Sequence, residues 1–69
     1  MKQEHKAIGR LYTQLIKAKE TQIDIVSNHG ESINIQTRSE IVDVWNALDI
    51  ALIAVHNAMK IEGIDYSKL

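Results

Sequence analysis

The sequence predicts an α+β fold in the order helix, β-hairpin, helix (α-β-β-α), assembled through the long C-terminal helix into an oligomer with a helical core. Three observations lead to this prediction. Apolar residues recur at helical spacing near the N-terminus, alternate with polar residues in the middle of the chain, and return to helical spacing near the C-terminus. The 69 residues are expected to form a single domain, 1–69, because a chain of this length supplies one core at most.

Residues 2–21 are predicted to form the first helix. Their apolar members recur at the i, i+3, i+4, i+7 spacing of an amphipathic helix: Ala7, Ile8, Leu11, Tyr12, Leu15, Ile16 and Ala18. The opposite side of this helix carries a basic band formed by Lys2, Lys6, Arg10 and Lys17. The first helix therefore has one apolar face and one solvated, basic face.

Residues 22–37 are predicted to form a β-hairpin, because the apolar period changes to two. A three-residue loop, Asn28-His29-Gly30, pairs Ile25 with Ile33 and also pairs Ile23 with Ile35. All four isoleucines then lie on one face of the ribbon. In this register Gly30 occupies the left-handed position of a type I turn with a bulge, which glycine favours.

Residues 38–62 are predicted to form the second helix. Thr37 as N-cap and Glu40 three residues later make a capping box, and Gly63 is the expected C-terminal stop. Residues 63–69 are a short tail. The main apolar stripe consists of Ile41, Val44, Trp45, Leu48, Leu52, Val55 and Met59.

A second apolar surface of this helix predicts self-association. Beside the main stripe runs a seam of alanines at spacings of 4, 3 and 4, which lets another helix approach closely. One helix and a ribbon cover only one broad side, so a two-fold copy is expected to cover the rest. The predicted oligomer interface comprises Ala47, Ile50, Ala51, Ala54, Ala58 and Ile61. In the alternative arrangement, the first helix of the same chain packs on the alanines and Ile50 and Ile61 stay exposed.

The composition supports oligomerisation as the source of extra stability. A chain of this size buries a small core, and without cysteine it has no disulfide to strengthen it. The N-terminus has no long apolar segment typical of a signal peptide, and the longest apolar run is far shorter than the roughly 20 residues of a membrane span. We expect a cytoplasmic protein without membrane contact.

The residues with catalytic or ligating side chains form no recognisable motif. His5, His29 and His56 lie on different predicted elements without metal-ligand spacing. Two turns of helix separate Asp49 from His56, roughly 10 Å, which is too far for a hydrogen bond. The chain also has no glycine-rich phosphate loop. We therefore expect no metal, no cofactor and no enzymatic activity.

Two surfaces remain as candidate binding sites. The polar band of the second helix, with an embedded isoleucine, is of the kind that partners or small ligands use; it comprises Arg38, Asn46, Asp49, Ile53 and His56. The band Lys2, Lys6, Arg10 and Lys17 could contact phosphates. A net charge of −1 and the order of the elements, which is neither helix-turn-helix nor ribbon-helix-helix, favour a plain solvated face there.

The sequence thus predicts a small homo-oligomeric interaction protein, an inhibitor, adaptor or regulator of another macromolecule. Its expected partners are further copies of itself and another protein. The first alternative is a small-ligand binder, for example a nucleotide-sequestering oligomer with pockets between subunits. The second and weaker alternative is a nucleic-acid binder that uses the basic face of the first helix.

Overall fold

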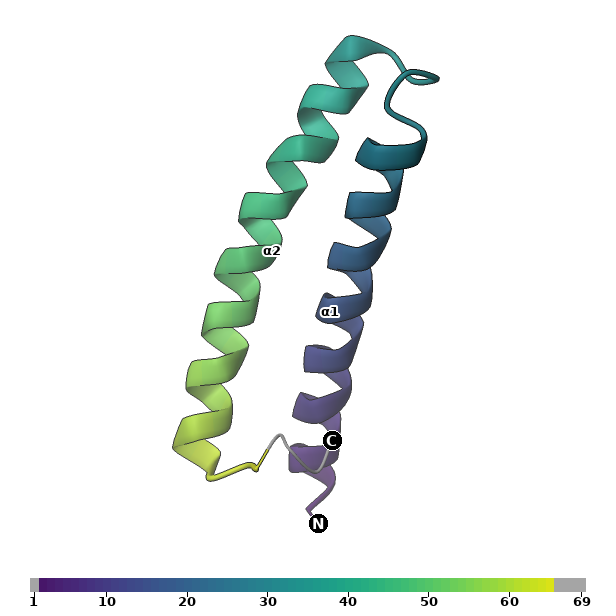
Figure 1. The fold of residues 1–69 in the computed structure, drawn as a ribbon. Helices are drawn as coiled ribbons and strands as arrows, with labels where there is room; N and C mark the ends of the chain where they lie inside the picture. The colour runs from purple at the N-terminus through teal and green to yellow at the C-terminus, as the bar shows by residue number, and fades with distance from the viewer. Residues whose placement is uncertain (1, 66–69) are drawn as a thin grey trace.

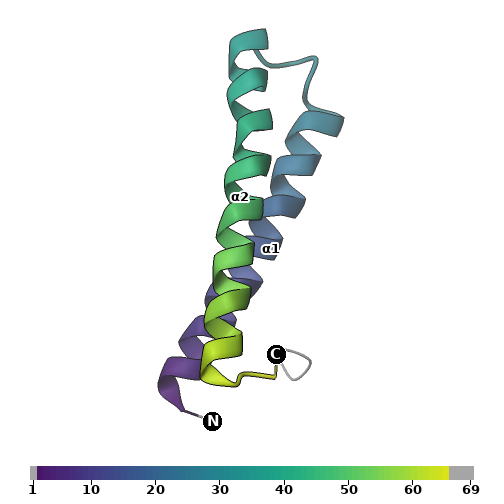
Figure 2. The same ribbon diagram turned by 90° about the vertical axis from the view of Figure 1, so that its left-hand side faces the viewer.

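The protein is a helical hairpin. The computed structural model describes residues 2–65, and within them α1 (Gln3–Asn28) and α2 (Ile35–Glu62) run antiparallel and side by side (Figures 1 and 2). The connecting loop lies at one end, and Lys2 and Asp65 lie at the other (Figure 1). The molecule is correspondingly long and thin, about 44 × 17 × 16 Å.

The predicted β-hairpin at residues 22–37 is wrong, and with it the α+β fold class. None of the described residues forms a strand: Gln22 to Asn28 continue α1, and Ile35 to Thr37 begin α2. The side of α1 that faces α2 does continue through the segment, but polar side chains occupy part of it. Lys19 and Gln22 occupy positions that face α2, so the pattern of apolar residues alone shows a break where the helix has none. An isolated two-stranded ribbon is also marginal in water, whereas the longer helices bury one side along their whole length.

The loop between the helices is held by backbone hydrogen bonds. The His29 amide donates to the Ile25 carbonyl at 3.0 Å, and the Ser32 amide donates to the His29 carbonyl at 3.0 Å. Gly30 lies against the end of α1, where a Cβ atom would come within 2.6 Å of the Val26 carbonyl oxygen. Glycine is therefore required at position 30 for close approach. The predicted left-handed conformation there is wrong, since Gly63 alone among the described glycines has a positive φ.

α2 begins earlier than predicted and ends where predicted. Asn34, rather than Thr37, caps the helix: its side-chain oxygen accepts a hydrogen bond from the Gln36 amide at 2.7 Å. At the other end Gly63 has φ 67°, and the Ile64 amide donates to the Met59 carbonyl at 2.9 Å. This left-handed stop after Glu62 confirms the predicted C-terminal signal. The predicted tail is described only as far as Asp65, and residues 66–69 lie outside the described part.

The core is small and lies near the open end of the hairpin. Val55, Met59 and Ile64 are buried, and Met59 is fully buried. Ile8, Tyr12 and Leu15 of α1 pack against these three residues. Toward the loop, polar contacts take over, as Gln22 Nε2 donates to the Ile41 carbonyl at 3.0 Å.

Candidate functional site

The side of α2 that faces α1 is occupied by the hairpin's own contacts. Near its middle, Lys19 Nζ lies 2.5 Å from Asp49 Oδ1 and 3.9 Å from the centre of the Trp45 ring. The lysine stem lies between the helices and its ammonium group is neutralised by the carboxylate. These contacts connect the basic helix to the apolar helix, and they leave the opposite side of α2 as the surface available for another molecule.

That opposite side, here called the outer face of α2, is exposed along its whole length. At about 100° per residue its members project away from α1. Three isoleucines on this face are among the most exposed large apolar residues of the described chain: Ile50 is 69% exposed, Ile53 62% and Ile61 83%. The outer face consists of Val42, Asp43, Asn46, Ala47, Ile50, Ile53, Ala54, Asn57, Lys60 and Ile61, all exposed.

The outer face contains most of the predicted oligomer interface. Ala47, Ile50, Ala54 and Ile61 are exposed, whereas Ala51 and Ala58 are half-buried. α1 packs around Val55 and Met59 of the main apolar stripe. Ile50 and Ile61 are exposed, as the alternative without self-association also expects, so the oligomer interface stays a prediction. Ile53, which the sequence assigned to a ligand surface, lies on the outer face with the predicted interface residues.

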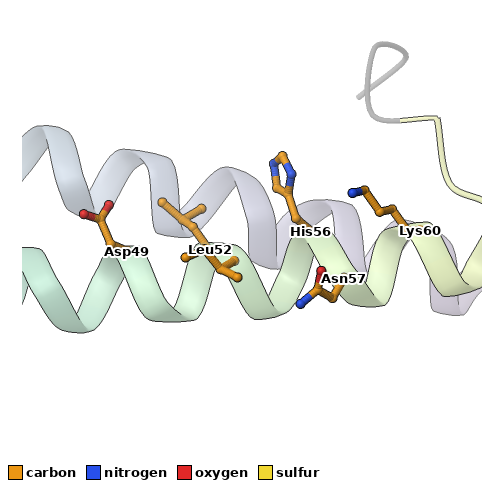
Figure 3. Close-up of a pocket in the computed structure, with 6 residues that line it drawn as sticks. Asp49, Leu52, His56, Asn57 and Lys60 are labelled. Carbon is orange, nitrogen blue, oxygen red and sulfur yellow. The ribbon is translucent and has the colours of Figure 1, made fainter.

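The predicted ligand surface is only partly brought together. An open hollow of about 420 Å³ is lined by Asp49, Leu52, Ile53, His56, Asn57 and Lys60 (Figure 3). Asp49, His56 and Lys60 project from the same side of α2 (Figure 3). Arg38 instead lines a separate polar hollow at the loop, together with Asn28, Gly30 and Glu31.

Two of the polar groups in the hollow are engaged by α1. Asp49 pairs with Lys19, and the His56 ring lies 5.3 Å from the Tyr12 ring. Both side chains therefore help to hold the two helices together. All residues that line the hollow belong to α2, and the hollow is open to solvent. Binding of a small ligand there stays a prediction.

The basic band, formed by Lys2 and three residues of α1, is exposed. Lys2, Lys6, Arg10 and Lys17 are all exposed, and none of them takes part in an ion pair within the described residues. Lys19, on the other side of the helix, is the lysine that the hairpin uses. Contact of the band with phosphates stays a prediction.

The histidines do not come together in the fold. His5 Nε2 lies 3.7 Å from Glu62 Oε1, and His29 Nε2 lies 3.6 Å from Asp24 Oδ2. The His56 ring is tilted by 47° against the Tyr12 ring. Within residues 2–65 no group of three or more histidine, aspartate or glutamate side chains is arranged to hold a metal ion.

The longest apolar run is too short to span a membrane, but α2 as a whole has another property. By length and composition it is long and apolar enough to cross a membrane. Core helices of soluble proteins share this length and composition, but they are mostly buried, whereas little of α2 is buried. The exposed isoleucines are therefore available for contact with a second protein or with a lipid bilayer. An experiment has to distinguish these two.

Comparison with protein-family models, with curated proteins and with solved structures finds no match for this chain. Its function is therefore inferred from its own surface.

Proposed function

We propose that the protein is a small homo-oligomeric interaction protein without enzymatic activity, which regulates, inhibits or adapts another macromolecule. Its first partner is a second copy of the same chain, bound through the outer face of α2. The observation that carries this proposal is the exposure of Ile50, Ile53 and Ile61 on one helix face.

Exposure of these isoleucines is costly in water. Burying one isoleucine side chain contributes about 1.5–3 kcal/mol, so covering the three by a second protein offers several kcal/mol toward the cost of association. Ala47 and Ala54 lie beside them and have small side chains, which lets a second helix come close.

The small size of the internal core gives a second reason for assembly. Within the described residues the buried apolar side chains are Val55, Met59 and Ile64. A two-helix hairpin with so small a core is marginal by itself, and association into a bundle is the usual way in which such hairpins gain stability.

The test is the molar mass in solution. Light scattering behind a size-exclusion column, run over a range of concentrations, should give at least two chains of 7.8 kDa for the parent protein. Ala54→Glu places a charge in the proposed interface and should shift the mass to that of a monomer. Ala18→Glu is the matched control, because it places the same charge at an exposed alanine of α1.

The outcomes separate the occupants of the outer face. A parent chain that is monomeric at every concentration contradicts the proposal. An Ala18→Glu variant that dissociates as readily as Ala54→Glu places the interface elsewhere and also contradicts it. Flotation with neutral phosphatidylcholine vesicles tests the bilayer: parent protein that floats, while Ala54→Glu stays behind, would assign the outer face to lipid.

A further inference from the structure

Eight of the ten residues on the outer face of α2 are arranged symmetrically about one point of the helix, and Ala47 and Ala54 are the two exceptions. In the forward direction it presents Val42, Asp43, Asn46 and Ile50, and in the reverse direction Ile61, Lys60, Asn57 and Ile53. Each forward residue has a counterpart at the same distance from the midpoint between Ala51 and Leu52. The four pairs match in kind: Val42 with Ile61 are aliphatic, Asp43 with Lys60 are acidic and basic, Asn46 with Asn57 are amides, and Ile50 with Ile53 are isoleucines. All eight side chains are exposed.

The same residues have the spacing of a coiled-coil seam. Asp43, Asn46, Ile50, Ile53, Asn57 and Lys60 follow one another at intervals that alternate between three and four. These are the a and d positions of a heptad repeat. When two such helices pair in opposite directions about a two-fold axis, residues on one side of the axis meet those equally far on the other side.

The charges distinguish the two directions of pairing. In an antiparallel pair, Asp43 of each copy lies opposite Lys60 of the other, which makes two attractive contacts. In a parallel pair in register, Asp43 meets Asp43 and Lys60 meets Lys60, which repel each other. Neither side chain has an ion-pair partner within residues 2–65, so both are available to a second copy.

The asparagines add a requirement on register. Asn46 of one copy lies opposite Asn57 of the other, and two amides can each donate and accept a hydrogen bond. Four of the six seam residues are polar or charged, and such residues cost stability when they are mismatched, so they select one register. A shift of either helix along the other would place these amides, and the charges beside them, against isoleucine.

We propose that two copies of the chain pair through α2 as an antiparallel homodimer whose two-fold axis passes between Ala51 and Leu52. This inference rests on the proposed self-association and names its geometry. Ile50 and Ile53 of both copies form the apolar centre, the asparagine pairs flank it, and the Asp43–Lys60 pairs close both ends.

The test is a charge-exchange experiment on the full chain. Four proteins are compared by sedimentation equilibrium at low salt: the parent, Asp43→Lys, Lys60→Asp and the variant with both changes. Asp43 and Lys60 are exposed, so the hairpin itself should remain folded, and circular dichroism checks this.

Each single change should weaken the dimer, because it turns two attractive contacts into two repulsive ones. We expect the dissociation constant to rise about tenfold for each single variant and to return to within about threefold of the parent in the double variant. An equimolar mixture of the two single variants should form heterodimers at least as readily as the parent forms homodimers, since every pair is then attractive. High salt should reduce all of these differences.

The outcomes separate this inference from the proposed function. A dimer that does not respond to the single changes, or single changes that neither the double variant nor the mixture rescues, overturns the antiparallel register while self-association through α2 stands. A parent chain that is monomeric at every concentration overturns both.

Discussion

At the scale of single residues, the stability of the hairpin depends most on Met59. It is fully buried in α2, and it packs with Val55 and Ile64 against α1. Because the core contains few other side chains, a cavity at this position has little around it that can fill the space.

We therefore predict that Met59→Ala lowers the free energy of unfolding by about 2–5 kcal/mol. Met59→Leu, which keeps the volume, should cost less than about 1.5 kcal/mol. Urea unfolding at one fixed protein concentration measures both values. Equal stability of the alanine variant and the parent would mean that the helices do not pack at this point.

Two single residues show which features of the fold the sequence predicts and which it does not. Gly63 was identified as the helix stop from its residue type and position, because a left-handed residue after a helix is most often glycine. Gln22 was not identified as buried. A glutamine in a helix is normally solvated, and its bond to the Ile41 carbonyl exists only once α2 lies alongside.

At the scale of elements, the two helices differ in what defines them. α1 has a basic outer side and a narrow apolar side, as its sequence indicates. α2 is apolar around most of its circumference, so its sequence identifies a helix without identifying which side meets α1. The sequence predicts the candidate interface because the alanine seam and Ile50 are apolar but lie outside the main apolar stripe. Ile53 was not assigned to it, because that assignment depends on knowing where α1 lies.

The wrong prediction of a β-hairpin in the middle of the chain has a physical explanation at this scale. Ile23, Ile25, Ile33 and Ile35 alternate with polar residues, which is the pattern of paired strands. In the structure the first two isoleucines lie in α1, Ile33 lies in the loop and Ile35 opens α2. β-branched residues are only slightly poorer helix formers than average, and contacts between helices override that preference.

The start of α2 provides a direct test of the element boundaries. Asn34→Ala should destabilise the hairpin by about 1 kcal/mol, because it removes the acceptor for the Gln36 amide. Thr37→Ala, at the cap position that the sequence suggested, should change stability by less than about 0.5 kcal/mol, since Thr37 lies inside the first turn. Thermal unfolding of the two variants side by side measures the difference, and the reverse order would place the helix start at Thr37.

At the scale of the whole molecule, the hairpin has three regions of different character. One side of α1 is basic, the interior between the helices holds a small core and the Lys19–Asp49 pair, and the outer face of α2 is largely apolar. Pairing two outer faces would place both α1 helices on the outside of the assembly. Their basic bands would remain exposed to other molecules, and the dimer would carry one such band on each side.

The most direct test of this account is a distance between the two copies. The chain contains no cysteine, so Ser39→Cys provides a single site for a nitroxide label near the start of α2. Pulsed electron spin resonance on the dimer should give a separation of about 40 Å, because the antiparallel register places the two labels about 25 residues apart along the helices at 1.5 Å each. A separation of about 10–15 Å would show that the helices pair in parallel, and a complete lack of coupling between labels in a concentrated sample would show that the chain does not pair.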